Sequence, residues 1–249
     1  MLYIRNEKYN MTIQVKSSAK IPHFLADVGE INSTLETVSS TDLEFDDNQF
    51  VPENSQLVLE QQYRSSSYSL LGALLRSAPN QNLLDILSEL VSEGDSREDD
   101  ALLLSMSTLS MSSKLISPES IEDEYHQLFI GLGKGEVVPY GSWYLTGFLM
   151  EKPLSDLRHD LSILGFERNE NVCEPEDHAA ALCEVFSLLI SEGNTLDQQY
   201  QFYKTHMEPW IGLFLNDLIE AKSAVYYKSV GRFGSAFIAF ESEYFSMQT

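Results

Sequence analysis

The chain has 249 residues, 43% of them apolar, and its 16 Lys and Arg against 38 Asp and Glu give a formal net charge of −22 at pH 7. A chain with this charge repels phosphate backbones and anionic membrane surfaces, which excludes nucleic-acid binding and attraction to such membranes. The charge instead keeps the protein in solution or favours a basic partner.

The cysteine count, the apolar runs and the chain length indicate the compartment and the number of domains. Cys173 and Cys183 are too few for a disulfide framework or a zinc site built from paired thiolates, and they fit a reducing compartment. The first residues lack the apolar core of a secretory signal, and no later apolar run approaches the roughly 20 residues that span a bilayer. We therefore expect a cytoplasmic protein of one or two domains.

Residues 1–54 differ from the rest of the chain. They are rich in Ser, Thr, Asn and acidic residues, and their apolar residues keep no sustained period. Such a composition buries too little apolar surface to offset the entropy of ordering. We predict a loosely ordered acidic N-terminal arm, with a short helix near Phe24–Leu35.

From Ser55 the apolar residues recur at helical spacing. The segments predicted as helices are Ser55 to the residue before Pro79, Asn82–Val91, Asp99–Lys114, a helix opened by Ser117-Pro118-Glu119 that runs through Phe129, Trp143–Met150, Pro153–Leu164, Pro175–Glu192, Leu196–Met207, Pro209–Lys222 and Ala224–Phe245. Gly231 and Gly234 should weaken the last of these. No two alternating apolar runs are joined by a tight turn, so strands are not expected.

The predicted fold class is therefore all-α. Residues 55–249 should form a single globular helical domain of about nine or ten helices. The irregular stretch Gly131–Ser142 would be a hinge loop that joins two halves of this domain.

Motifs for enzymatic chemistry are missing from the sequence. Gly131, Gly133 and Gly135 alternate, but they follow a helix rather than a strand, so they do not fit a dinucleotide fingerprint. The five histidines are scattered, and no pair has the spacing of metal ligands. We expect no catalysis, no metal and no cofactor.

Two short segments stand out. In the first, Tyr125, Leu128 and Phe129 share one helix face, for which core packing is the simplest explanation. The aromatic cluster at Pro139, Tyr140 and Trp143, after the glycine loop, is more typical of a binding pocket, because these rings combine apolar area with a polar tip.

The second segment is Glu174-Pro175-Glu176-Asp177-His178. It predicts a helix start, with Glu174 as the cap, Pro175 at the first helical position and two acids in the first turn. His178 would then lie one turn inside a buried helix, where it needs a partner. A carboxylate at the mouth of a groove is a good receptor for arginine guanidinium groups.

These segments, in this order and about fifty residues apart, resemble the TorD/DmsD/NarJ family of cytoplasmic chaperones for molybdenum enzymes. The resemblance covers roughly residues 55–220. It implies an all-α protein, not an enzyme, that binds the twin-arginine signal peptide of a redox enzyme, holds the apo-enzyme for cofactor insertion and proofreads it before Tat export. Carried over by position, the signal-peptide site comprises Asp177, His178, Glu176, Pro139, Tyr140, Trp143, Tyr125, Leu128 and Phe129.

The resemblance also implies a client and an assembly. The client would be a molybdoenzyme of the formate dehydrogenase type or the trimethylamine oxide or dimethyl sulfoxide reductase type, and the chaperone a monomer or a domain-swapped dimer. Two alternatives stay open. One is a nucleotide-binding switch or enzyme that uses the loop Gly131–Gly135, with Lys134 on a phosphate; the other is a helical scaffold subunit.

Overall fold

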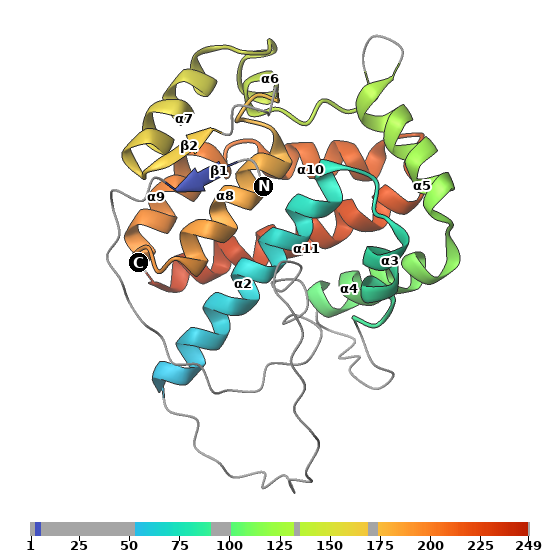
Figure 1. The fold of residues 1–249 in the computed structure, drawn as a ribbon, viewed down its shortest axis with the longest axis horizontal. Helices are drawn as coiled ribbons and strands as arrows, with labels where there is room; N and C mark the ends of the chain where they lie inside the picture. The colour runs from blue at the N-terminus through green and yellow to red at the C-terminus, as the bar shows by residue number, and fades with distance from the viewer. Residues whose placement is uncertain (1–2, 6–52, 91–100, 132–134, 169–173, 249) are drawn as a thin grey trace, which may run out of the picture.

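The computed structural model describes residues 3–5, 53–90, 101–131, 135–168 and 174–248 (Figure 1). Within these ranges the chain forms ten α-helices, one π-helical turn and two short strands, so the all-α prediction is confirmed. The α-helices are α2 (Glu53–Arg76), α3 (Gln81–Ser88), α4 (Ala101–Leu115), α5 (Pro118–Tyr125), α6 (Gly141–Thr146), α7 (Lys152–Ile163), α8 (Ala179–Ser191), α9 (Leu196–His206), α10 (Ile211–Glu220) and α11 (Tyr226–Gln248). The predicted helix at Phe24–Leu35 lies outside the described residues.

Helix α8 is the centre of the core, and Figure 1 shows it alongside α2. Its residues from Ala179 to Cys183 are all buried, as the apolar composition of this segment predicts. The two helices approach closely at Gly72, where a Cβ atom would lie 3.3 Å from the carbonyl oxygen of Ala180. Ser65 and Ser187 donate their hydroxyls to each other's backbone carbonyls, at 3.0 and 2.9 Å, and fix the register.

The long C-terminal helix α11 is unbroken, so Gly231 and Gly234 do not interrupt it. Gly231 and Gly234 face α10, where added Cβ atoms would lie 2.8 Å from Ile219 Cγ1 and 2.7 Å from Leu215 Cδ2. The glycines therefore let two helices pack at short distance, and this tertiary gain outweighs their low helix propensity.

The segment around Ser117 behaves largely as predicted. Ser117 is the N-cap of α5, its hydroxyl accepts a hydrogen bond from the Ser120 N–H, and Pro118 occupies the first turn. The predicted helix through Phe129 changes type, because α5 ends at Tyr125 and the π-helical turn η2 (His126–Ile130) follows it.

Two short strands were not expected from the sequence. β1 (Tyr3–Arg5) pairs antiparallel with β2 (Phe166–Arg168), beside α7 in Figure 1. The strands are three residues long and more than 160 residues apart, so no hairpin signal precedes them.

One continuous core joins the helices on both sides of the loop that ends at Tyr140. Leu109 and Leu128 before the loop belong to the same buried cluster as Phe186 and Phe214 after it. Across the described ranges, no helix combines the length and apolarity that crossing a bilayer requires.

Candidate functional site

The two conspicuous sequence segments meet in space. Tyr140 and His178 form an isolated antiparallel bridge; the Gly141 N–H donates to the Asp177 carbonyl at 2.9 Å, and the Ala179 N–H donates to the Pro139 carbonyl at 2.8 Å. These backbone bonds fix the start of α6 against the start of α8. Local sequence predicted both segments, and the fold brings them together.

The helix start at the second segment differs from the prediction. Pro175 to His178 form a turn in which the His178 N–H donates to the Pro175 carbonyl, and α8 begins only at Ala179. The cause is tertiary, because the backbone groups next to this turn bond to the first segment instead of to a helical turn. Glu174 is therefore not the cap, and Glu176 and Asp177 are not in the first turn of a helix.

His178 is the N-cap of α8 rather than an interior residue. Its Nδ1 accepts a hydrogen bond from the Ala180 N–H at 3.0 Å, and its ring lies edge-on to Tyr140 with the centroids 5.1 Å apart. Burial, followed by the nearby positive charge of Arg76, lowers the pKa of His178 to about 3. The imidazole is therefore neutral at physiological pH and adds no positive charge to the site.

Asp177 is only 4% exposed and its two carboxylate oxygens differ. Oδ2 accepts a hydrogen bond of 2.7 Å from the Ser142 N–H in the first turn of α6. Oδ1 is buried and accepts no hydrogen bond from any described residue. A buried charged oxygen without a partner is costly, so it marks a place where a donor would be strongly favoured.

The other two acids of the motif already have partners. Glu176, 5% exposed, accepts a hydrogen bond of 2.8 Å from Arg158 Nε on α7, and Arg158 Nη2 forms an ion pair with the same oxygen at 2.7 Å. Glu174 accepts a hydrogen bond from the Tyr140 hydroxyl, and burial together with this bond raises the pKa of Tyr140. Glu176 and Glu174 thus hold α7 and the aromatic loop in place. Asp177 differs from them in having a buried oxygen, Oδ1, without a partner among the described residues.

The remaining predicted residues lie around this centre. Trp143 on α6 is half-buried, and Leu128 is fully buried in the core. Tyr125 donates its hydroxyl to the Arg76 carbonyl at 2.8 Å and contacts Phe129, with the ring centroids 5.0 Å apart. Leu128 therefore packs in the core, whereas Tyr125 and Phe129 are half-buried and pack against each other.

A cavity of about 170 Å³ opens beside Asp177, and we call it the Asp177 cavity. Its wall includes Asp177, Leu145, Asp156, Leu157 and Trp210. The sequence analysis missed the last four, because they come from α6, α7 and the start of α10 and share no motif. These residues come together only in the folded protein. In the sequence, the one hint of a binding site among them was the large aromatic residue Trp210, next to Pro209.

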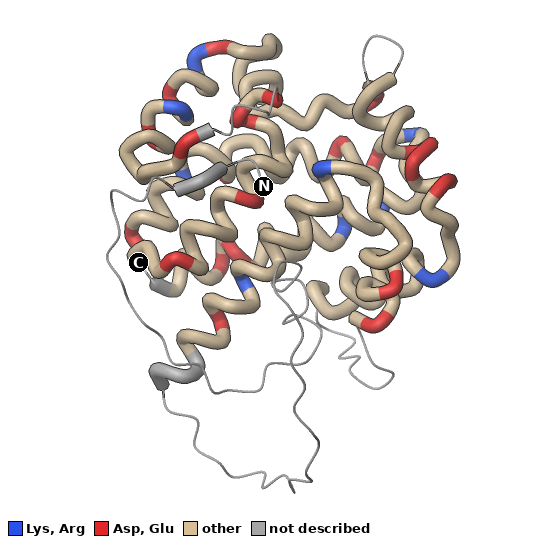
Figure 2. Tube along the Cα trace, in the orientation of Figure 1, with Lys and Arg blue, Asp and Glu red and all other residues tan. Residues whose placement is uncertain are grey.

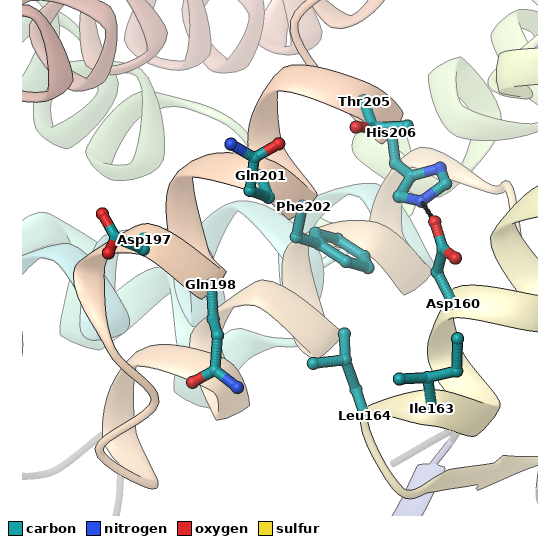
Figure 3. Close-up of a pocket in the computed structure, with 9 residues that line it drawn as sticks. All are labelled: Asp160, Ile163, Leu164, Asp197, Gln198, Gln201, Phe202, Thr205 and His206. Atoms are coloured by element: carbon teal, nitrogen blue, oxygen red, sulfur yellow. Dashed lines mark hydrogen bonds and ion pairs between the residues drawn. The ribbon is translucent and has the colours of Figure 1, made fainter.

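A second cavity, of about 440 Å³, lies between α7 and α9, and Figure 3 draws its lining residues. We call it the α7–α9 cavity. Together the two cavities are lined by Asp156, Asp160, Asp177 and Asp197, and no Lys or Arg occurs among the described residues of either wall. Figure 2 shows acidic positions on helices throughout the molecule and fewer basic ones. The site therefore favours cations.

The sequence is similar to several known proteins. Residues 93–216 match the family described as nitrate reductase delta subunit. "Chaperone protein TorD" of Vibrio parahaemolyticus is 26% identical over 133 residues, which cover 49% of this chain and 62% of that protein. "Chaperone protein TorD" of Shewanella pealeana is 24% identical over 208 residues, covering 74% of this chain and 90% of that protein.

A solved structure is also similar. The crystal structure of a putative redox enzyme maturation protein from Archaeoglobus fulgidus aligns with a TM-score of 0.45 and 17% sequence identity, covering 80% of this chain and 99% of that one. The match to the Vibrio parahaemolyticus relative spans less than two thirds of that relative's own length.

Proposed function

This chain belongs to the TorD/NarJ family, and on that basis we propose that it is a chaperone for the maturation of a redox enzyme, without catalysis of its own. Its ligand is the twin-arginine signal peptide of a molybdenum-cofactor enzyme. The chaperone binds this peptide in the cytoplasm and holds the apo-enzyme until its cofactor is inserted, before Tat export. The matching relatives are named chaperones, which supports this reading over an enzyme.

The observation that carries the proposal is the open acceptor of Asp177. Oδ1 is a buried acceptor without a partner among the described residues, and Asp177 lines a small acidic cavity. A guanidinium group presents several N–H donors in a rigid fork. Hydrogen bonds to charged groups contribute about 1.5–3 kcal/mol each, and the low local polarity strengthens them. An arginine side chain would satisfy both the charge and the geometry.

A second carboxylate serves the second arginine. Asp156 lines the same cavity, is 53% exposed, and forms an ion pair with Lys152 on the surface of α7. Exposed pairs of this kind contribute about 0–1 kcal/mol, so an incoming guanidinium can replace the lysine at little cost. Two adjacent arginines would thus meet one buried and one exposed acid.

The other motif residues support this site from behind. We infer that Glu176 and His178 hold the turn that carries Asp177, and that Pro139, Tyr140 and Trp143 shape the wall next to it. Every described residue of the cavity wall lies in the predicted domain 55–249. Lys134, which the nucleotide alternative requires, lies outside the described residues.

Calorimetric titration with a twin-arginine peptide tests the proposal. Asp177→Asn keeps the size of the side chain and the acceptor for the Ser142 N–H, but it turns the open acceptor into a neutral group. We expect it to weaken binding by about 10- to 100-fold. Replacing both arginines of the peptide with lysines should weaken binding to the unmodified protein as well, because lysine lacks the planar fork.

Asp217→Asn is the matched control, because Asp217 is an acid on α10 that accepts a hydrogen bond from Tyr144 outside the cavity wall. It should leave the affinity unchanged. Equal affinity of the unmodified protein and a folded Asp177→Asn variant would contradict the proposal.

A further inference from the structure

The α7–α9 cavity differs in character from the Asp177 cavity. Ile163, Leu164 and Phe202 give it an apolar wall, and Gln198 and Gln201 add neutral polar groups. Figure 3 shows the Phe202 ring directed from α9 toward the side where Leu164 and Ile163 lie. The volume of about 440 Å³ falls within the roughly 300–1,000 Å³ typical of ligand pockets. Its wall suits apolar side chains.

The two cavities are neighbours that share part of their wall. Thr205 and His206 line both of them. At this junction His206 Nε2 lies 2.8 Å from Asp160 Oδ2, and the His206 side chain is buried while that of Asp160 is 42% exposed. A ligand chain that places a cation at Asp177 therefore reaches the apolar wall by passing Thr205 and the Asp160–His206 pair.

Exposure and charge narrow the class of ligand. Ile163 is 71% exposed, and covering such a side chain with an apolar group is favourable by the hydrophobic effect. Asp160 and Asp197 border the cavity without a lining Lys or Arg, so acidic ligand residues would be repelled. The cavity therefore suits an apolar segment that carries no acid.

We propose that the α7–α9 cavity binds the apolar residues that follow the arginine pair in the same signal peptide. The inference rests on the proposed function, and it adds a second subsite and a direction to it. The arginines enter the Asp177 cavity, the chain passes Thr205, and the apolar residues lie against Ile163, Leu164 and Phe202. Occupancy of both subsites would distinguish signal peptides from other basic segments.

One other apolar surface competes for this role. Phe148, Leu149 and Met150, between α6 and α7, are 68%, 48% and 71% exposed. We favour the α7–α9 cavity because it is hollow and can enclose apolar side chains on several sides, whereas these three residues are exposed on a connecting segment.

The first test is a cycle of two peptides and two protein variants, measured by calorimetry. One peptide keeps the arginine pair and the apolar residues, and the other has serines in place of the apolar residues. Ile163→Ser should weaken binding of the apolar peptide about 3- to 10-fold and leave the serine peptide unaffected. Val225→Ser is the control, because Val225 is an equally exposed β-branched residue (71%) outside both cavity walls, and it should change neither affinity.

The second test locates the apolar residues directly. A photoreactive phenylalanine derivative placed among them should cross-link to residues 163–164 or 197–206. Cross-links to residues 148–150 instead, or equal affinities of the Ile163→Ser and Val225→Ser variants for the apolar peptide, would overturn the inference.

The outcomes separate this inference from the proposed function. Binding that depends on the arginines and Asp177 but not on Ile163 would refute the second subsite alone. Binding that depends on Ile163, but is the same for arginine and lysine peptides, would refute the arginine site alone. Absence of binding by both peptides would refute both.

Discussion

At the scale of single residues, the members of the Glu174–His178 motif make different kinds of contact. The Asp177 carboxylate accepts a structural hydrogen bond from the Ser142 N–H through Oδ2, and its buried Oδ1 has no partner among the described residues. His178 caps α8, and Glu176 neutralises Arg158. The neighbours of Asp177 carry most of the structural contacts, and its Oδ1 accepts no hydrogen bond from any described residue.

The buried imidazole of His178 makes stability depend on pH. Its pKa is about 3 in the folded protein and about 6.5 in an unfolded chain, so the unfolded state binds a proton first as the pH falls. The stabilisation is complete above pH 6.5 and is lost progressively toward pH 3. Between pH 7.5 and 5.0 the His178 contribution to the free energy of unfolding should fall by about 2 kcal/mol.

Urea denaturation of the unmodified protein and of His178→Asn at both pH values measures this contribution. Asparagine is a good N-cap and does not titrate, so the variant should lose about 2 kcal/mol less on acidification. If both proteins lose the same free energy, the buried neutral histidine is not the cause.

Sequence alone identified the motif residues, because Glu-Pro-Glu-Asp-His carries its chemistry in the residue types. It did not place them correctly on the helix. A proline followed by acids fits both a helix start and a turn, and the choice here depends on backbone bonds to Pro139 and Gly141, forty residues away. The residues of α7 and α10 that line the cavity could not be predicted from the sequence either, since their position depends on tertiary packing.

At the scale of helices, local sequence also failed to show the role of the glycines in α11, because that role depends on tertiary packing. Local propensity treats Gly231 as a weak point, whereas in the fold it is a contact point with α10. The helix ends were predicted to within a few residues where a cap or proline is local, as at Ser117. The predicted ends were less accurate where hydrogen bonds to distant segments determine where a helix begins, as at the turn before Ala179.

We predict that Gly231→Ala lowers the free energy of unfolding by about 1–3 kcal/mol despite its better helix propensity. The added Cβ atom would lie 2.8 Å from Ile219 Cγ1 and 3.2 Å from the Leu215 carbonyl oxygen, and the backbone oxygen cannot move aside easily. Gly212→Ala in α10 is the control, because nothing lies within 4 Å of its added Cβ. It should be neutral or slightly stabilising in the same denaturation experiment, and an equal loss in both variants would contradict this account.

At the scale of the whole molecule, a buried polar cluster joins three helices that are distant in sequence. Arg64 on α2 is 1% exposed and donates to Glu241 on α11 at 2.6 Å and to Gln199 on α9 at 2.9 Å. Its guanidinium also lies over the Tyr244 ring, 4.2 Å from the centroid. The cluster fixes α2, α9 and α11 relative to one another behind the site.

Arg64→Met should lower the free energy of unfolding by about 3–5 kcal/mol, because it leaves Glu241 buried without its ion-pair partner. The double variant Arg64→Met, Glu241→Leu should regain much of this loss, since no unpaired charge remains. Lys204→Ala removes an exposed ion pair with Glu208 and should leave stability nearly unchanged. Thermal and urea denaturation measure all three, and a double variant no more stable than Arg64→Met would contradict the explanation.

Because the net charge is −22, salt should stabilise the folded protein but weaken its binding of a cationic peptide. Raising the ionic strength screens repulsion among the acids of the folded chain, so the midpoint of thermal unfolding should rise. The same screening weakens attraction between the acidic cavities and a cationic peptide, so its dissociation constant should rise too. Measured from 20 to 500 mM NaCl, the two quantities should increase together. Peptide affinity that stays constant while stability rises would mean that apolar contacts, rather than the carboxylates at Asp177 and Asp156, supply the binding free energy.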